Sequence, residues 1–136
     1  LGRDAAVEPC EGIIERCYGT FEEGPHDALP TDVWDPGEDL VPFGGEGSKA
    51  LQERMVATLT NLMGAEGIEP LLAVSHGSAS RQFIKAAAPE GFELPAKLPN
   101  CAIMIFGFEE AKPQAEGEPM QCQFTLQQIV DPQQSN

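Results

Sequence analysis

Residues 75–78, Ser-His-Gly-Ser, combine the residue types of an anion-binding site. They follow an apolar run at residues 71–74, which predicts a strand, and precede residues 80–88, whose pattern predicts a helix. The first N–H groups of a helix are unpaired and carry partial positive charge, so they attract anions. Gly77 lets the backbone approach a ligand closely, and a protonated His76 would add a full charge. We predict that His76 is functional, although a single histidine is often only a loop residue.

A second candidate is the segment 15–19, Glu-Arg-Cys-Tyr-Gly, which follows two isoleucines. A glutamate at the end of a strand or loop could donate a proton to a leaving oxygen. The pentapeptide alone favours the simpler alternative, a surface ion pair of Glu15 with Arg16. The other histidine, His26, lies in an acidic loop and is expected to be solvated.

Other kinds of catalytic site find little support in the sequence. The chain has 2 His and 4 Cys, and no cysteine pair has the Cys-x-x-Cys spacing of a zinc or redox motif. No phosphate loop ending in Gly-Lys-Ser/Thr and no Gly-x-Ser-x-Gly elbow occurs. We therefore expect no metal ion and no cofactor.

The charge balance restricts the partners. The 136 residues include 8 Lys and Arg against 22 Asp and Glu, a net charge of −14. A nucleic acid or an anionic membrane would require a basic surface, so both are excluded as partners. A small anionic ligand needs only a local positive pocket. The longest apolar run, residues 101–106, is far shorter than the roughly 20 residues of a membrane span.

The length predicts one domain, and the patterns within it predict an α/β fold. Residues 48–63 predict a helix, with Ser48 as N-cap and Gly64 as C-cap. Residues 22–47 read as a long loop over a site, because prolines and glycines are frequent there. The helix at 80–88 should bury Phe83, Ile84 and Ala87.

Three segments predict strands: 71–74, 102–108 and 124–130. The run at 71–74 lacks alternation, which is typical of a strand covered on both faces in a parallel sheet. A strand, a helix and a strand in this order predict a right-handed crossover between parallel strands. Residues 111–121 are polar and predict a solvated hairpin connection. Ligands of such sheets bind beyond the carboxyl ends of the strands, where His76 stands.

Four segments, taken together in their order, resemble the histidine phosphatase superfamily in its phosphoglycerate mutase-like branch. Residues 14–22 resemble its Glu-x-x-x-Gly-x-(aromatic)-Glu segment, and residues 43–47 its Gly-Gly-Glu-Ser turn, with Gly47 in place of Ser. Residues 74–78, with Arg81 after them, resemble its second-histidine motif. Residues 98–102 resemble the entry to a late strand.

The resemblance implies a three-layer α/β/α sandwich with a mainly parallel sheet, formed by a single domain over residues 1–136. It also implies that the sheet is incomplete at its N-terminal side. The family begins with a strand that carries Arg-His-Gly, followed by a helix, and this chain has no Arg-His-Gly. The chain does not begin with Met either, so we expect missing upstream residues rather than a natural pseudoenzyme.

The resemblance also implies roles for particular residues. The histidine outside this chain would become phosphohistidine, and Glu15 would protonate the leaving oxygen and then activate water. His76 and the N–H groups of Gly77 and Ser78 would hold the phosphoryl oxygens. Arg16 and Tyr18 would contact the rest of a small phosphorylated metabolite.

Three functions stay open. The first is a phosphomonoester phosphatase, a hydrolase, which the short segment between Glu15 and His76 favours. The second is a phosphoglycerate mutase, an isomerase, and the third is a non-catalytic phosphate-binding remnant. Cys101 lies in an apolar run and is expected to be a buried thiol. Unpaired cysteines predict a reducing, cytoplasmic setting. The oligomeric state stays open, a homodimer included.

Overall fold

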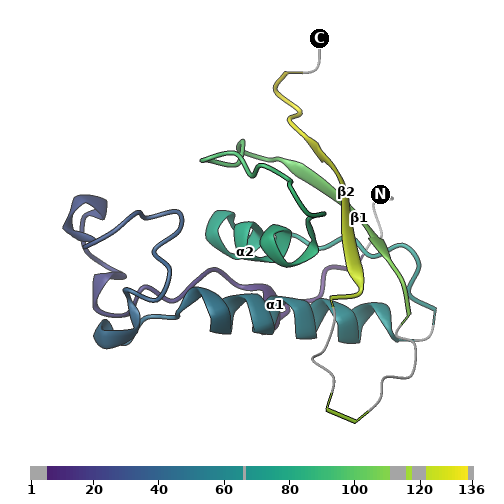
Figure 1. Ribbon diagram of the computed structural model, residues 1–136, viewed down its shortest axis with the longest axis horizontal. Helices are drawn as coiled ribbons and strands as arrows, with labels where there is room; N and C mark the ends of the chain where they lie inside the picture. Colours follow the sequence, from purple (N-terminus) through teal and green to yellow (C-terminus); the bar gives the residue numbers. More distant parts are fainter. Residues whose placement is uncertain (1–5, 66, 111–115, 118–121, 135–136) are drawn as a thin grey trace.

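The computed structural model describes residues 6–65, 67–110, 116–117 and 122–134. It contains two helices, α1 (Ser48–Met63) and α2 (Gly77–Ala87), and two strands, β1 (Ile103–Phe108) and β2 (Phe124–Val130). Four single 3-10 turns lie before α1, at Glu11–Ile13, Gly19–Phe21, His26–Ala28 and Val41–Phe43. The helices run alongside each other, the strand pair packs against them, and the 22–47 loop extends beyond the start of α1 (Figure 1).

Helix α1 confirms the expected helix at residues 48–63. Leu51, Met55 and Leu59 recur every four residues and are buried. The C-cap is Gly64, as predicted, but the N-cap is Gly47 rather than Ser48. The capping acceptor comes from a distant residue, because Lys49 N–H donates to Glu38 Oε1 at 2.9 Å.

The glycine at position 47 has a physical reason. A Cβ built on Gly47 would overlap the Glu38 carboxylate. The carboxylate that caps α1 therefore occupies the space that a serine side chain would need. A serine at this position would have to displace that flexible side chain.

Helix α2 begins three residues earlier than the sequence predicts, at Gly77. Phe83, Ile84 and Ala87 are buried, which confirms its predicted apolar face. Its first turn is also buried, although it consists of small residues: Ser78 is 1% exposed and Ala79 is 0% exposed. Small side chains here let another segment pack directly against the beginning of the helix.

The core lies between the two helices and the strand pair. Its buried members are Leu51, Met55, Leu59, Ala79, Phe83, Ala87 and Phe124. The Phe83 ring packs edge-on against Phe106 and Phe124, with centroids 4.8 and 5.1 Å apart. Such aromatic pairs add to the stabilisation that burial of the rings provides.

The strands β1 and β2 confirm two of the three predicted strands, and they pair antiparallel. The register runs from Ile103 opposite Val130 to Phe108 opposite Phe124, with an irregularity between Ile105 and Phe106. Antiparallel pairing agrees with the predicted hairpin, most of whose connection lies outside the described residues. The chain is therefore a mixture of helices and strands, and the parallel sheet of a three-layer sandwich is not confirmed.

The third predicted strand, residues 71–74, forms no strand pairing with any described residue. We predicted that it would be covered on both faces, and this is wrong for three of its four residues, Leu72, Ala73 and Val74. Leu72 is 64% exposed and Val74 is 82% exposed, whereas Leu71 packs against the core. A parallel strand needs a neighbour to satisfy its backbone groups, and no described segment supplies one.

Residues 22–47 form a loop, as predicted. Leu40 and Asp35 within the loop, and Tyr18 in the segment before it, hold the loop in place. Leu40 is fully buried. Asp35 accepts hydrogen bonds from Lys85 and Gln82 of α2, the latter at 3.0 Å. The Tyr18 hydroxyl donates to the carbonyl of Val33 at 3.0 Å. The loop is therefore fastened to α2 and to the segment that carries Glu15.

All four cysteines are free thiols. Cys101 is exposed, so its predicted burial is wrong. It lies in a turn before β1 with a φ of 59°, outside the packed part of the strand. No helix among the described residues is both long enough and apolar enough to cross a membrane.

Candidate active site

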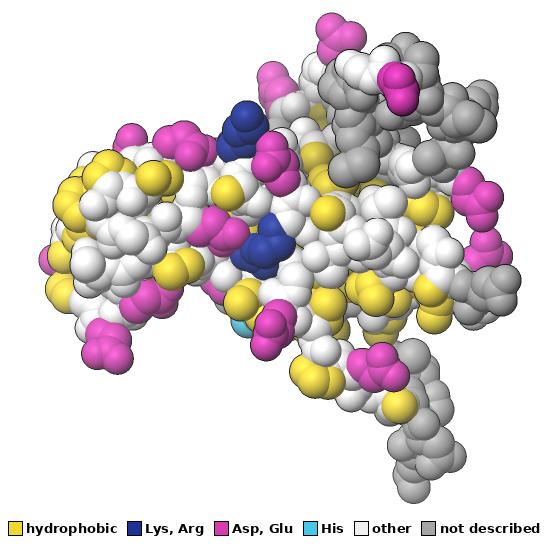
Figure 2. Space-filling model, turned by 90° about the horizontal axis from the view of Figure 1, so that it is seen from below, with side chains coloured by type: hydrophobic (Ala, Val, Ile, Leu, Met, Phe, Trp, Pro, Cys, Tyr) yellow, Lys and Arg dark blue, Asp and Glu magenta, His cyan; other side chains and the backbone are white. Residues whose placement is uncertain are grey.

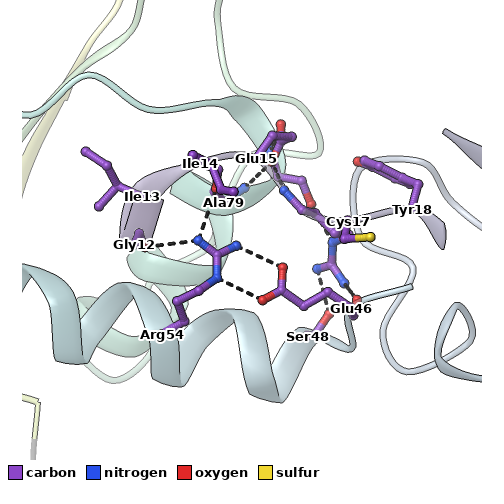
Figure 3. Close-up of polar contacts among 12 residues, drawn as sticks. Gly12, Ile13, Ile14, Glu15, Cys17, Tyr18, Glu46, Ser48, Arg54 and Ala79 are labelled. Atoms are coloured by element: carbon purple, nitrogen blue, oxygen red, sulfur yellow. Dashed lines mark hydrogen bonds and ion pairs between the residues drawn. The ribbon is translucent and has the colours of Figure 1, made fainter. Parts of the chain in front are cut away.

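The carboxylate of Glu15 lies at the N-terminus of α2. It accepts hydrogen bonds from the N–H groups of Ser78, at 3.2 Å, and Ala79, at 2.8 Å. The N–H of Arg16 donates to the same carboxylate at 2.8 Å. Two predicted motifs that are far apart in the sequence therefore meet at one helix end (Figure 3).

The backbone before each motif is held by a direct contact. The hydroxyl of Ser75 donates to the carbonyl of Ile13 at 2.6 Å. This bond places residues 13–15 beside residues 75–79, so that Glu15 reaches the first turn of α2. The α2 amides carry the positive end of the helix dipole, which explains why a carboxylate occupies this position.

His76 is the N-cap residue of α2. Its backbone is extended, with φ −124° and ψ 170°, and its carbonyl accepts the first intrahelical bond from Ser80 N–H at 2.9 Å. No side-chain oxygen within the motif caps the helix, because His76 has none. The imidazole is exposed and free to meet a ligand.

The amides of Gly77 and Ser78 differ in their availability. Among the described residues, the Gly77 N–H has no acceptor, whereas the Ser78 N–H is already bonded to Glu15. A phosphoryl oxygen can therefore use Gly77 directly and can use Ser78 only if Glu15 moves. Trp34 covers Gly77, since a Cβ there would be 3.2 Å from the indole. A larger residue would push the indole away from the helix end.

Arg16 lies beneath the site and is 2% exposed. Its guanidinium donates to Ser78 Oγ and Ser48 Oγ, each at 2.9 Å, and to the Glu46 carbonyl at 2.8 Å. Burial lowers the pKa of Arg16, and nearby acidic groups oppose that effect. The contact of Arg16 with substrate stays a prediction, and its observed role is to join the starts of α1 and α2.

Tyr18 lies on the loop side of the site. Burial raises the pKa of its phenol, while Ser78 and Arg16 oppose that shift. Its hydroxyl is committed to the Val33 carbonyl. Its predicted contact with substrate is likewise untested.

Three further residues, Trp34, Arg81 and Lys97, line the same groove as His76. The sequence motifs include Arg81 but neither Trp34 nor Lys97. The Lys97 ammonium lies 5.2 Å from the Trp34 ring centroid, within range of a cation–π contact. Arg81 donates to the Pro95 carbonyl at 2.7 Å and pairs with Asp35. Folding thus places these two cations in the groove that His76 also lines.

A groove of about 1310 Å³ begins beside His76. Residues 69–77 and residues 96–106 line it, together with apolar side chains of both helices. Leu72, Val74, Ile103 and Ile105 are exposed. The unpaired segment 71–74 and β1 therefore both border the groove.

Figure 2 shows acidic side chains spread over this face of the molecule and few basic ones, and the sequence has 22 Asp and Glu against 8 Lys and Arg. The cations near α2 are therefore a local exception on an acidic protein. Within the described part of the chain, no three or more His, Cys, Asp and Glu side chains gather closely enough to hold a metal ion.

The ion pair between Glu46 and Arg54 lies close to the Glu15 segment. Arg54 Nε and Nη2 donate to the two Glu46 carboxylate oxygens at 2.9 and 2.8 Å. These hydrogen bonds hold the pKa of Glu46 below its ordinary value, against a smaller effect of burial. Glu46 belongs to the predicted turn motif, but the pattern gave it no partner.

The lowered pKa of Glu46 predicts an acid-dependent contribution to stability. A carboxyl with a lower pKa when folded stabilises the protein above its unfolded pKa, about 4.3. That contribution is lost as the pH falls through the folded pKa. Glu46→Gln should lower the melting temperature at pH 7 and have less effect below about pH 4. Thermal unfolding from pH 3 to 7 measures this, and Glu53→Gln, on the exposed side of α1, is the control.

Comparison with known proteins agrees with this site. The family model of the histidine phosphatase superfamily (branch 1) matches residues 1–118. The comparisons gave no match to a curated protein and none to a solved structure. The match includes Glu15, His76 and both helices that position them. The chain therefore belongs to the histidine phosphatase superfamily.

Proposed function

We propose that this chain is part of a phosphomonoester phosphatase that works through a phosphohistidine. The main observation in support is that Glu15 and His76 both lie at the N-terminus of α2. A carboxyl group can donate the proton that a leaving oxygen needs, and an imidazole can donate a hydrogen bond at an anion-binding helix end. Membership of the superfamily supports phosphatase or mutase chemistry in general.

The anion would bind first. The phosphoryl oxygens of a small phosphorylated metabolite accept hydrogen bonds from His76 and from the open Gly77 N–H. Donors fixed in advance stabilise the negative charge that develops on these oxygens during transfer. Arg81 and Lys97, which line the groove with His76, add positive charge nearby.

The transfer itself would occur in two steps. The P–O bond of the ester breaks as a bond forms between phosphorus and a histidine nitrogen, and Glu15 gives its proton to the leaving oxygen. Water then attacks phosphorus, Glu15 takes a proton from that water, and the N–P bond breaks to release inorganic phosphate. Glu15 must leave the Ser78 and Ala79 amides to reach the leaving oxygen, and this frees the Ser78 N–H for the phosphoryl group.

The nucleophilic histidine is proposed to come from outside these residues. His76 holds the N-cap position, which suits charge stabilisation, and His26 begins a short 3-10 turn in the loop. The groove beside His76 supports this, since an added strand could pair with residues 71–74 and with β1. Such a strand would also complete the parallel sheet of the expected three-layer sandwich.

A phosphoglycerate mutase is the second candidate, because the superfamily supports both activities. A mutase would pass the phosphoryl group to another substrate hydroxyl instead of water. The phosphatase is favoured because only 60 residues separate Glu15 from His76, which leaves a short loop over the site. The four free thiols suit a reducing compartment, so we propose the cytoplasm as its location.

Trapping of a phosphoenzyme tests the proposed function. The full-length protein, incubated with a labelled phosphomonoester and then denatured, should carry label that is acid-labile and base-stable. The 136-residue chain should bind vanadate but take up no label. Label passed to a second metabolite would identify a mutase, and vanadate binding by an unlabelled full-length protein would identify a remnant. Turnover by the 136-residue chain near an ordinary ~10 s⁻¹ would overturn the assignment of the nucleophile.

A further inference from the structure

We infer that Arg54 is a positioning residue for Glu15, an inference that rests on the proposed function. Arg54 lies in α1 and belongs to none of the sequence motifs. It makes no contact with His76 or with the amides of α2. Its guanidinium instead holds the backbone from which Glu15 projects (Figure 3).

Arg54 directly contacts the backbone that precedes Glu15. Arg54 Nη1 donates to the carbonyl of Gly12 at 3.0 Å and to the carbonyl of Ile14 at 3.3 Å. Ile14 immediately precedes Glu15, so the second bond fixes the peptide group that leads into the catalytic candidate. Gly12 lies against α1, since a Cβ there would overlap Thr58.

Glu46 sets the orientation of the Arg54 guanidinium. Both Glu46 carboxylate oxygens accept from Arg54, a fork-to-fork geometry that fixes the guanidinium plane. The main chain of Glu46 holds the other side of Glu15. Its N–H donates to the Cys17 carbonyl at 2.7 Å, and its carbonyl accepts from Arg16. Residues 46 and 54 therefore clamp the Glu15 segment from both ends.

The backbone that carries Glu15 also lacks regular secondary structure. Residues 14–18 belong to no helix or strand, so no regular ladder of hydrogen bonds sets their position. A general acid must lie within hydrogen-bond reach of the leaving oxygen, and small displacements slow proton transfer strongly. In this segment, side chains of other elements must supply the precision that a helix or strand would otherwise provide.

If Arg54 positions Glu15, its replacement should slow substrates with poor leaving groups more than substrates with good ones. Arg54→Met in the full-length protein should misplace Glu15 and leave the anion site intact. Alkyl phosphates, which need a protonated leaving oxygen, should lose at least about tenfold more kcat than p-nitrophenyl phosphate, whose leaving group hardly needs one. Inhibition by vanadate should change by less than about twofold, because His76 and Gly77 still bind the anion.

Two further variants keep the test decisive if Arg54→Met does not fold. Arg54→Lys retains the charge but cannot bond two carboxylate oxygens and two carbonyls together. Glu46→Gln retains the Arg54 side chain and weakens its orientation. Both should show the same selective loss on alkyl phosphates, to a smaller extent. Leu51→Ala is the matched control, because it disturbs the core packing of α1 without touching the Glu15 segment.

The outcomes separate this inference from the proposed function. If the folded Arg54 and Glu46 variants slow both substrates equally, as the Leu51→Ala control is expected to do, Arg54 is merely structural and the inference is wrong. The same assays on Glu15→Gln test the proposed function itself. If that variant shows no preference between leaving groups, the general acid is misassigned and the inference falls with it.

Discussion

Glu15→Gln should slow the hydrolysis of alkyl phosphates by about 10²–10⁴-fold, the usual contribution of a positioned general acid. Hydrolysis of p-nitrophenyl phosphate should slow far less, because its leaving oxygen departs without a proton. The single amide oxygen of the glutamine can replace Oε1 as acceptor for the Ala79 N–H, whereas the Ser78 N–H, which bonds to Oε2, loses its acceptor, so the start of α2 should keep part of its cap. Parallel measurements of kcat on the two substrates check this result.

The control for Glu15→Gln is Glu22→Gln, which removes an acidic side chain from the same motif. Glu22 is exposed and accepts a hydrogen bond only from the Tyr18 N–H among the described residues. It should leave the ratio of the two rates unchanged. Equal slowing of both substrates by Glu15→Gln would indicate a binding role for Glu15 in place of proton donation.

His76→Ala should weaken vanadate inhibition of the full-length protein by at least tenfold, about 1.4 kcal/mol or more. The imidazole is exposed at the N-cap of α2, so its removal takes away a hydrogen-bond donor without opening a cavity in the core. The Gly77 N–H and the helix dipole remain, so binding should weaken rather than vanish. An inhibition assay with vanadate measures the change.

His26→Ala, at the other histidine of the chain, is the matched control for His76→Ala. It should leave vanadate inhibition unchanged, because His26 lies in a short turn of the 22–47 loop. Unchanged inhibition in His76→Ala would remove His76 from the anion site. It would leave the Gly77 and Ser78 N–H groups as the remaining predicted donors at that helix end.

The helices α1 and α2 and the strands β1 and β2 could be predicted from the sequence, because the residue patterns that specify them lie within a few residues of each other. The four-residue spacing of Leu51, Met55 and Leu59 predicted α1, and Phe83, Ile84 and Ala87 predicted the buried face of α2. The candidate site was readable in part for the same reason. A His-Gly pair between an apolar run and a helix indicates an anion site without knowledge of the rest of the chain.

The contacts that complete the site could not be read from local patterns. Glu15 caps α2 and Glu38 caps α1, and each glutamate is distant in sequence from the helix that it caps. Composition carries no signal for such pairings, so α2 was predicted to begin three residues late. The bonds of Arg54 to carbonyl oxygens were equally hidden, because every residue offers a carbonyl as an acceptor.

The strand prediction at residues 71–74 shows a different limit. An apolar run without alternation indicates burial on both faces, but burial depends on a neighbour that the run itself does not specify. In the described chain, the neighbouring space is a groove, and Val74 is 82% exposed. The same exposure supports the proposal that another strand belongs there.

The central claim is that Glu15 and His76 share one anion site at the start of α2. A titration of the 136-residue chain with vanadate, followed by amide chemical shifts in NMR spectra, tests it most directly. The account predicts saturable shifts concentrated at the amides of Gly77, Ser78 and Ala79 and at the Glu15 segment, with the His76 ring signals moving in step. Saturable shifts centred elsewhere, with the amides of residues 76–79 unmoved, would contradict it.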